Sequence, residues 1–424
     1  MELQELNHWW IEREVRSDFV PSTYRTLYFE IEKDLERRQI QAIIGLRRTG
    51  KSTILFQVIN KLIKVRNVNP KHVIYCSFDE PEFQEKRIED ILKEYSKVTD
   101  IDYKKEKVYL FLDEVQKAKN WVSSTKLIYD NFRNIKIFIS GSASLNIFTE
   151  AKSSLAGRVI YYELKPLNFK EFLMFKGLNE AVKNPLLYKD IIEKEFDKFL
   201  TRQFPEIIKE DDTLFIKKYI RNSVIEPIIL KDIPKQFKEI DILLLETLIN
   251  IFMVNPGQYL QVDEFSKELK RAKKTLYNAI SYLQYSFLIK RILNFRPSIR
   301  ASSRKLSRIY AYHPSLTLPF NVPIEKYVEN LVISELDAKY YWREKEKEID
   351  ALINSIPIEV KYTSKIGKED IRSLKYFYKR YSKTLGVNKM FIITKDLEGE
   401  IDGITLIPLY KFCLEGIQLT QRFP

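Results

Sequence analysis

The residues best suited to chemistry form a glycine-rich stretch, Gly45-Leu46-Arg47-Arg48-Thr49-Gly50-Lys51-Ser52. Its spacing, Gly-x-x-x-x-Gly-Lys-Ser, is that of a P-loop. It follows the apolar run 40–44 and opens a helical pattern, which is the context that a P-loop requires. Glycines let backbone N–H groups turn toward phosphate, and the helix N-terminus adds the positive end of its dipole. We therefore predict that Lys51 contacts terminal phosphates and that Ser52 binds magnesium.

A pair of acids completes this predicted site. The apolar run 108–112 leads directly into Asp113 and Glu114. We expect Asp113 to hold Mg²⁺ and Glu114 to polarise the attacking water, so the pair favours hydrolysis over nucleotide storage. It also disfavours a nucleotide kinase, which would share the P-loop. The predicted nucleotide-binding residues are Gly45, Arg47, Arg48, Thr49, Gly50, Lys51, Ser52, Thr53, Asp113 and Ser140.

Ser140 and Arg158 each allow a structural as well as a catalytic interpretation. Ser140 ends the apolar run 135–139, where it could sense the γ-phosphate or simply close a turn. Arg158 opens the run 159–162 and is a candidate arginine finger, acting in cis or on a neighbouring copy. The second possibility would require at least a dimer, so a homo-oligomer stays open.

A second group of chemically capable residues lies near the C-terminal end. Two strand-like segments, 348–353 and 356–361, flank Asn354-Ser355. A two-residue turn there would place Asp350 opposite Glu359. With period-two alternation, the apolar side chains form one face and the charged ones the other. The expected apolar face consists of Ile349, Ala351, Ile353, Ile356, Ile358 and Val360.

Opposed carboxylates are unfavourable unless a positive charge lies between them. A divalent metal held by Asp350, Glu359 and Glu329 of the preceding helix would supply that charge and could activate water on a phosphodiester. Lys361 would help to position the nucleophile. The alternative is a solvated strand face with a local salt bridge.

Several runs resemble one family of prokaryotic AAA+-like ATPases that is abundant in archaea. They are Trp9-Trp10, 45–53, 111–116 with Trp121, 140–142, 155–158, Pro166-Leu167 with Glu171-Phe172, and 204–206. The resemblance implies ATP with Mg²⁺ as the nucleotide. It also implies a winged helix after the ATPase domain and a C-terminal domain of the restriction-endonuclease-like PD-(D/E)xK type. In this chain Ile349 replaces the proline of that pattern.

The elements that must position these residues suggest a multidomain α/β protein. Continuously apolar strand patterns from residue 40 to 165 predict a doubly wound parallel sheet. We expect four parts: a P-loop ATPase core at 1–165, a helical lid at 166–236, a winged helix at 237–322 and a small nuclease-like α/β domain at 323–424. Within the third part we expect helices 240–254, 263–271 and 273–285 and strands 287–295 and 306–312.

Charge points to a nucleic-acid partner. The formal net charge is +13, and phosphate neutralisation supplies much non-specific DNA affinity. Basic residues gather before and within the expected recognition helix (Lys270, Arg271, Lys273, Lys274), in the wing (Arg296, Arg300, Arg304, Lys305, Arg308) and near the C-terminal end (Lys365, Lys368, Arg372, Lys375, Lys379, Arg380, Lys383). The alternative for these groups is a solvated or packing face. No apolar run is long enough to span a membrane, so we expect a cytoplasmic protein.

The leading hypothesis is an ATP-hydrolysing enzyme that acts on DNA. The alternative is an ATP-dependent regulatory switch that binds proteins through a catalytically inactive nuclease-like domain. A metal-dependent DNA endonuclease activity would separate the two hypotheses.

Overall fold

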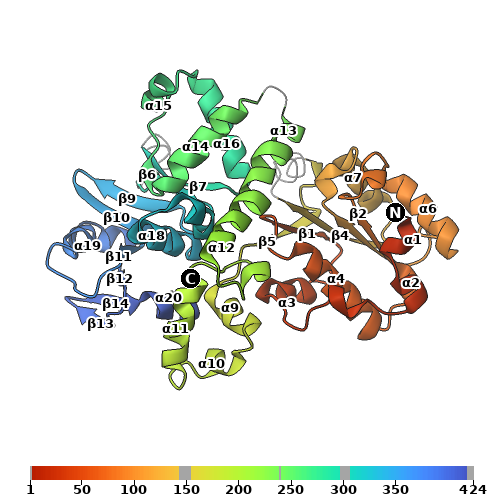
Figure 1. Ribbon diagram of the computed structural model, residues 1–424, viewed down its shortest axis with the longest axis horizontal. Coiled ribbons are helices and arrows are strands. Elements are labelled where there is room, and N and C mark those ends of the chain that lie inside the picture. The colour runs from red at the N-terminus through yellow and green to blue at the C-terminus, as the bar shows by residue number, and fades with distance from the viewer. Residues whose placement is uncertain (1, 143–153, 238–239, 297–305, 418–424) are drawn as a thin grey trace. The chain divides into compact units, whose positions relative to one another are not determined.

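The computed structural model (Figure 1) describes residues 2–142, 154–237, 240–296 and 306–417. They form two compact units, Met1–Pro166 with Asp232–Lys238, and Leu167–Lys231 with Glu239–Pro424. None of the helices within these ranges combines the length and apolarity needed to cross a bilayer.

The first unit is built on a five-stranded, all-parallel sheet in the order β2-β3-β4-β1-β5. All five expected strands are present: β1 (Ile40–Gly45), β2 (Val73–Ser77), β3 (Val108–Asp113), β4 (Ile135–Ser142) and β5 (Val159–Leu164). Every residue of β1 and β3 is buried, as their continuous apolar runs predicted. In Figure 1, helices α3 (Thr26–Lys33) and α4 (Lys51–Lys64) lie on one side of the sheet and α7 (Trp121–Asn131) on the other. This arrangement is the doubly wound fold expected from the sequence.

Short and peripheral elements complete the first unit. They are α1 (Leu3–Leu6), α2 (Trp9–Glu12), α5 (Pro81–Gln84), α6 (Ile88–Thr99), α13 (Ile233–Gln236) and the 3-10 helices η1 (Ser17–Phe19), η2 (Pro70–His72) and η3 (Val115–Lys117). The side chains of Trp9 and Trp10 are buried and both donate to the carbonyl of Val73 on β2. The N-terminal segment is therefore fixed to the sheet.

The second unit contains a nine-stranded sheet in the order β13-β14-β12-β11-β10-β9-β7-β8-β6. Its strands are β6 (Gln258–Tyr259), β7 (Ile289–Asn294), β8 (Ser307–Ala311), β9 (Tyr340–Glu344), β10 (Lys347–Ile353), β11 (Ile356–Lys361), β12 (Phe391–Thr394), β13 (Gly399–Ile401) and β14 (Ile404–Pro408). A parallel pairing of β7 with β9 joins segments expected in separate domains. The expected boundary at residues 322–323 therefore falls inside one continuous sheet.

Helices accompany this sheet in the second unit. They are α9 (Phe169–Phe175), α10 (Asn179–Lys183), α11 (Lys189–Phe199), α12 (Thr213–Tyr219), α14 (Ile242–Val254), α15 (Val262–Glu268), α16 (Lys273–Tyr285), α18 (Ile324–Glu335), α19 (Arg372–Leu385) and α20 (Leu409–Glu415), with 3-10 helices η4 (Pro205–Ile207) and η7 (Pro314–Phe320) and π-helices η5 (Ile220–Ile225) and η6 (Ile228–Asp232). Phe169 and Phe172, from the segment expected to form a lid, lie in one buried cluster with Ile358 and Ile393. That segment is thus part of the second unit's core.

The hairpin of β10 and β11 turns as the sequence predicted. Asn354 and Ser355 have φ values of 47° and 69°, the left-handed pair that a type I′ turn needs. The strand faces differ from the prediction, however, because the pairing of β10 with β9 shifts register between Ile349 and Leu352. These two side chains join one buried cluster and Ala351 joins another. Ile353, Ile356, Ile358 and Val360 lie with Ala351, as predicted. The prediction was wrong for Ile349, because the shift breaks the alternation there and both faces of the hairpin are covered.

Candidate functional site

The P-loop bends between β1 and α4, and its lysine begins the helix. Gly50 caps α4 with a φ of 95°, a conformation that favours glycine. The Lys51 ammonium donates to the carbonyls of Leu46 at 2.8 Å and Gly45 at 3.3 Å, and it lies 4.0 Å from the Glu114 carboxylate. Burial lowers the pKa of Lys51, against the opposing effect of nearby acids. The predicted phosphate-binding lysine and catalytic acid are therefore neighbours.

The carboxyl ends of β3 and β4 bring Asp113 and Ser140 together. The Ser140 hydroxyl donates to Asp113 Oδ1, and the Tyr75 hydroxyl donates to Asp113 Oδ2 at 2.8 Å. The Ser52 side chain lies close enough to Asp113 to favour its ionised form. Burial raises the pKa of Asp113, and the charge of Glu114 adds to this effect. β4 lies between β1 and β3, which explains why these predicted residues meet at one edge of the sheet.

Two features of the loop have causes that sequence motifs do not reveal. A side chain on Gly45 would place its Cβ 2.2 Å from the carbonyl oxygen of Leu164, so glycine is needed there for close packing of β1 against β5. Buried Arg25 donates to the carbonyls of Thr49 at 2.7 Å and Lys165 at 2.8 Å. Arg25 thus fixes the loop to the end of β5, and no motif in the sequence marked it.

Among the predicted phosphate contacts, Arg47 has a protein partner. Its guanidinium binds both oxygens of Asp232, with distances of 2.8 Å and 2.5 Å. Asp232 is the last residue of η6, directly before α13, and no pattern in the sequence singled it out. Arg48 is exposed with a φ of 64°, and Thr53 is partly buried on the first turn of α4.

Arg158 lies at the amino ends of the parallel strands, whereas the P-loop lies at their carboxyl ends. Its carbonyl accepts from Ile40 N at 2.8 Å, and the adjacent Val159 pairs with Ile40 at the start of β1. The P-loop follows the other end of that strand. The Arg158 guanidinium binds Asp130 at 2.8 Å and 3.1 Å. This geometry is unsuited to a cis arginine finger, and the trans role stays a prediction.

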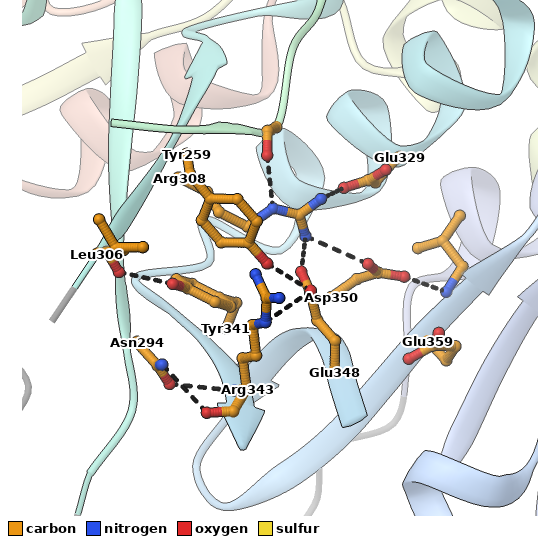
Figure 2. A network of polar contacts seen from close by, with 12 residues as sticks. Tyr259, Asn294, Leu306, Arg308, Glu329, Tyr341, Arg343, Glu348, Asp350 and Glu359 are labelled. Carbon is orange, nitrogen blue, oxygen red and sulfur yellow. Dashed lines mark hydrogen bonds and ion pairs between the residues drawn. The ribbon is translucent and has the colours of Figure 1, made fainter. Parts of the chain in front are cut away.

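Figure 2 shows the C-terminal carboxylates gathered around an arginine. Arg308, expected on the wing, is buried and binds Glu329 at 2.7 Å and Asp350 at 3.3 Å. The Lys361 ammonium lies 2.9 Å from Glu359. Across the described parts of the chain, no group of three or more His, Cys, Asp or Glu side chains is arranged to hold a metal ion. Arg308 thus binds an oxygen of Glu329 and one of Asp350, and Lys361 binds one of Glu359. The metal site expected at these three acids stays a prediction.

The acids of this cluster titrate unusually. Burial, with the neighbouring charge of Glu329, raises the pKa of Asp350 to about 6. Burial likewise raises the pKa of Glu359 well above its ordinary value. Burial alone would raise the pKa of Glu329, but Arg308 and Lys326 outweigh it and the pKa is lowered. The cluster is thus a low-dielectric site in which the basic partners decide which acids are ionised.

The expected basic surface is only partly available. Lys270, Arg271, Lys273 and Lys274 are exposed before and at the start of α16. Arg271 binds Asp241 at 2.7 Å and Lys273 binds Asp263 at 2.5 Å, however. The expected basic residues near the C-terminal end are all exposed, just before α19 or on it: Lys365, Lys368, Arg372, Lys375, Lys379, Arg380 and Lys383. Of the expected wing residues, Arg300, Arg304 and Lys305 lie outside the described residues.

Comparison with known proteins divides the chain into three segments. Residues 37–173 match the model of an AAA domain, whereas 195–319 and 324–412 match two domains of unknown function, DUF8612 and DUF4143. Among solved structures, the ORC1 protein of Aeropyrum pernix in complex with DNA aligns with a TM-score of 0.33 and 12% identity, over 73% of this chain and 94% of that one.

Two proteins of Methanocaldococcus jannaschii are similar in sequence. Uncharacterized protein MJ1637 is 28% identical over 300 residues, covering 63% of this chain and 60% of that protein. Uncharacterized protein MJ1544 is 31% identical over 418 residues, covering 91% of this chain and 90% of that protein. The chain therefore belongs to the same family as MJ1544, and its N-terminal part is an AAA-type P-loop ATPase domain.

Proposed function

We propose that this protein binds and hydrolyses ATP and that ATP turnover changes how its C-terminal half holds DNA. One observation carries the ATPase part: the Lys51 ammonium lies 4.0 Å from the Glu114 carboxylate. A phosphate-binding cation and a water-activating carboxylate must be neighbours if water is to attack the terminal phosphate. The hydrogen bonds of Ser140 and Tyr75 to Asp113 further orient the acid pair.

Each residue of the site has a distinct task. Lys51 and the backbone N–H groups at the start of α4 would neutralise the terminal phosphates. Ser52 and Asp113 suit Mg²⁺, because an oxygen donor set fits this ion and the two side chains are near one another. When bound, Mg²⁺ would offset charge on the β- and γ-phosphates. Glu114 would orient the attacking water and accept its proton.

ATP hydrolysis by matched variants tests this proposal. Glu114→Gln should retain ATP binding but lower kcat by about 10²–10⁴-fold, the usual contribution of a general base. Lys51→Ala should abolish binding and turnover together. Asp79→Asn, at an exposed acid outside the acid pair, serves as the control for a general loss of surface charge. Unchanged kcat in Glu114→Gln would refute the assigned role of that acid.

The DNA part of the proposal rests on the order and charge of the elements after residue 241. Helices α14, α15 and α16 followed by the antiparallel pair β7–β8 have the order of a winged helix. In such domains the recognition helix enters the major groove. Lys270 and Lys274 are exposed before and on the first turn of α16. These lysines would contact phosphate rather than bases, so the expected binding depends on salt more than on sequence.

Binding to duplex DNA at several salt concentrations tests this part. Each lost phosphate contact should reduce the slope of log K against log salt by about 1. The variant Lys270→Ala with Lys274→Ala should therefore lower the slope by about 2, whereas the exposed control pair Lys104→Ala with Lys119→Ala should leave it unchanged. Equal slopes for both variants, or a rate of ATP turnover that does not change when DNA is added, would remove the support for a DNA partner.

A second function is favoured by the burial of Arg308 among the carboxylates. In this alternative, the C-terminal part is a PD-(D/E)xK-like fold without nuclease activity, and ATP binding controls a protein interface. Incubation of DNA with Mg²⁺ or Mn²⁺ separates the two functions. Cleavage that disappears in Asp350→Ala or Glu359→Ala would exclude the inactive alternative.

A further inference from the structure

Arg308 uses every nitrogen of its guanidinium group within the second unit. Its Nε donates to the Gly257 carbonyl at 2.6 Å, and Nη2 binds Glu329 at 2.7 Å. Its Nη1 binds Glu348 at 3.0 Å and Asp350 at 3.3 Å (Figure 2). The side chain is only 7% exposed. A buried cation with this many acceptors is an organised component of the fold, unlike a surface arginine available to phosphate.

Three tyrosines surround this cation. The guanidinium carbon lies 5.3 Å from the ring centre of Tyr310, 5.7 Å from that of Tyr341 and 6.0 Å from that of Tyr259. The Tyr310 hydroxyl also donates to Glu329 at 2.6 Å, and the Tyr259 hydroxyl donates to Glu348 at 2.5 Å. The rings exclude water and their faces favour a cation, so the same residues serve both the arginine and its acids.

The acid pair of the hairpin is engaged by protein donors. Asp350 Oδ1 binds Arg308, and Asp350 Oδ2 accepts from the backbone N–H of Val360 at 2.9 Å. Glu359 Oε1 binds Lys361, while Glu359 Oε2 is buried with no hydrogen-bond partner among the described residues. A divalent metal needs several oxygen lone pairs directed at one point. Here one oxygen of Asp350 and one of Glu329 bind nitrogens of Arg308 and are therefore not directed at a shared metal position.

We infer that Arg308 replaces a divalent metal as the cation of this carboxylate cluster. The cluster is thereby a metal-independent structural centre, and it joins β8 of the segment 195–319 to α18 and β10 of the segment 324–412. An arginine balances the charge of opposed acids but cannot generate a metal-bound hydroxide. The C-terminal half therefore holds its shape without Mg²⁺ and does not hydrolyse phosphodiesters.

Metal binding by the full-length, nucleotide-free protein gives the first test. Mn²⁺ is titrated calorimetrically into the wild type and into Asp350→Asn, and thermal unfolding is followed with and without EDTA. We expect the same Mn²⁺ isotherm for both proteins, because any ion held near Asp113 is common to them, and no shift of the melting temperature by EDTA. A Mn²⁺ site that is present in the wild type and lost in Asp350→Asn would overturn the inference.

The second test removes the cation. Arg308→Met keeps much of the length of the side chain but leaves buried acids unpaired, so the unfolding equilibrium should shift by at least about a hundred-fold. The matched control Arg343→Met removes an arginine whose side chain is 40% exposed and whose ion pair with Glu348 is long, at 4.0 Å. The effect of this control on stability should be small. If Arg308→Met does not fold, Arg308→Lys provides the comparison, with a smaller loss. Stability equal to the Arg343→Met control in either Arg308 variant would refute the structural role.

Discussion

Replacing Gly257 with alanine should disturb the packing around Arg308 without removing any charged group of the carboxylate cluster. Gly257 has a φ of +89°, and its carbonyl accepts the hydrogen bond from Arg308 Nε. A Cβ atom at this position would lie 3.0 Å from Glu329 Oε1 and 3.1 Å from both Arg308 Nη2 and the Tyr310 ring. The added methyl group therefore presses on the cation, one acid and one wall of the cluster simultaneously.

The expected cost has two parts. An alanine in the left-handed region costs about 1–2 kcal/mol. Displacement of Arg308 weakens a hydrogen bond to a charged donor, whose loss costs about 1.5–3 kcal/mol. Because the tyrosine ring is fixed by packing, the strain cannot be relieved by moving one flexible chain end. We expect a total loss of about 2.5–5 kcal/mol in the local stability of β8 and β10.

Native-state hydrogen exchange measures this loss separately for each strand, which avoids treating a two-unit protein as a single cooperative transition. Gly386→Ala is the matched control, since Gly386 has a φ of +65° and no heavy atom within 4 Å of the added Cβ among the described residues. Gly386→Ala should lower local stability only at the end of α19, and only by the cost of the left-handed backbone, about 1–2 kcal/mol. If Gly257→Ala reduces protection no more than Gly386→Ala does, the close packing around Arg308 has no energetic consequence and the reasoning fails.

Three further predictions concern the first unit. Asp232→Asn should lower the Kd for MgATP by about three- to ten-fold, because phosphate would no longer compete with Asp232 for Arg47; calorimetric titration checks this, and an unchanged Kd would show that Arg47 keeps its protein partner. Arg158→Ala should lose ATPase activity and regain it when mixed with Lys51→Ala subunits, since each copy would supply the residue the other lacks; no recovery in mixed samples would argue against a trans finger. Burial lowers the pKa of Lys136 to about 8 from 10.5, so the unfolded chain binds more protons between these values and stability should rise with pH by up to about 1.4 kcal/mol per unit. Lys136→Met should remove this rise in urea unfolding measured at several pH values, and an identical slope in both proteins would contradict the assignment.

Local patterns determined what could be predicted from the sequence. Strands β1 and β3 follow almost continuously apolar runs, so their burial was predictable from residue types alone. The P-loop is a contiguous motif, and Asp113 directly follows an apolar run, so neither required long-range information. The turn at Asn354-Ser355 was equally local, because two residues with positive φ values specify its geometry.

Features created by long-range packing could not be predicted in this way. Arg25 lies 24 residues from Thr49 and Asp232 lies 185 residues from Arg47, and neither belongs to a recognisable pattern. The register shift between Ile349 and Leu352 depends on β9, a strand that the sequence analysis did not predict. The pairing of β7 with β9 across the expected boundary at residues 322–323 was not predictable for a similar reason, since it is a long-range contact.

The carboxylate hairpin shows how a sound physical premise can miss a partner that lies far away in the sequence. Opposed buried acids do need a positive charge, and residues 348–361 contain only Lys361 to supply one. The second charge comes from Arg308, which lies 42 residues before Asp350 and had been assigned to a solvent-exposed wing because its neighbours are basic. The parallel pairing of β7 with β9 brings the β7–β8 hairpin beside these acids. The pairing that continues the sheet across the expected boundary therefore also brings in the cation. Separating β7 from β9 should remove the counter-charge of the acids and also interrupt the sheet.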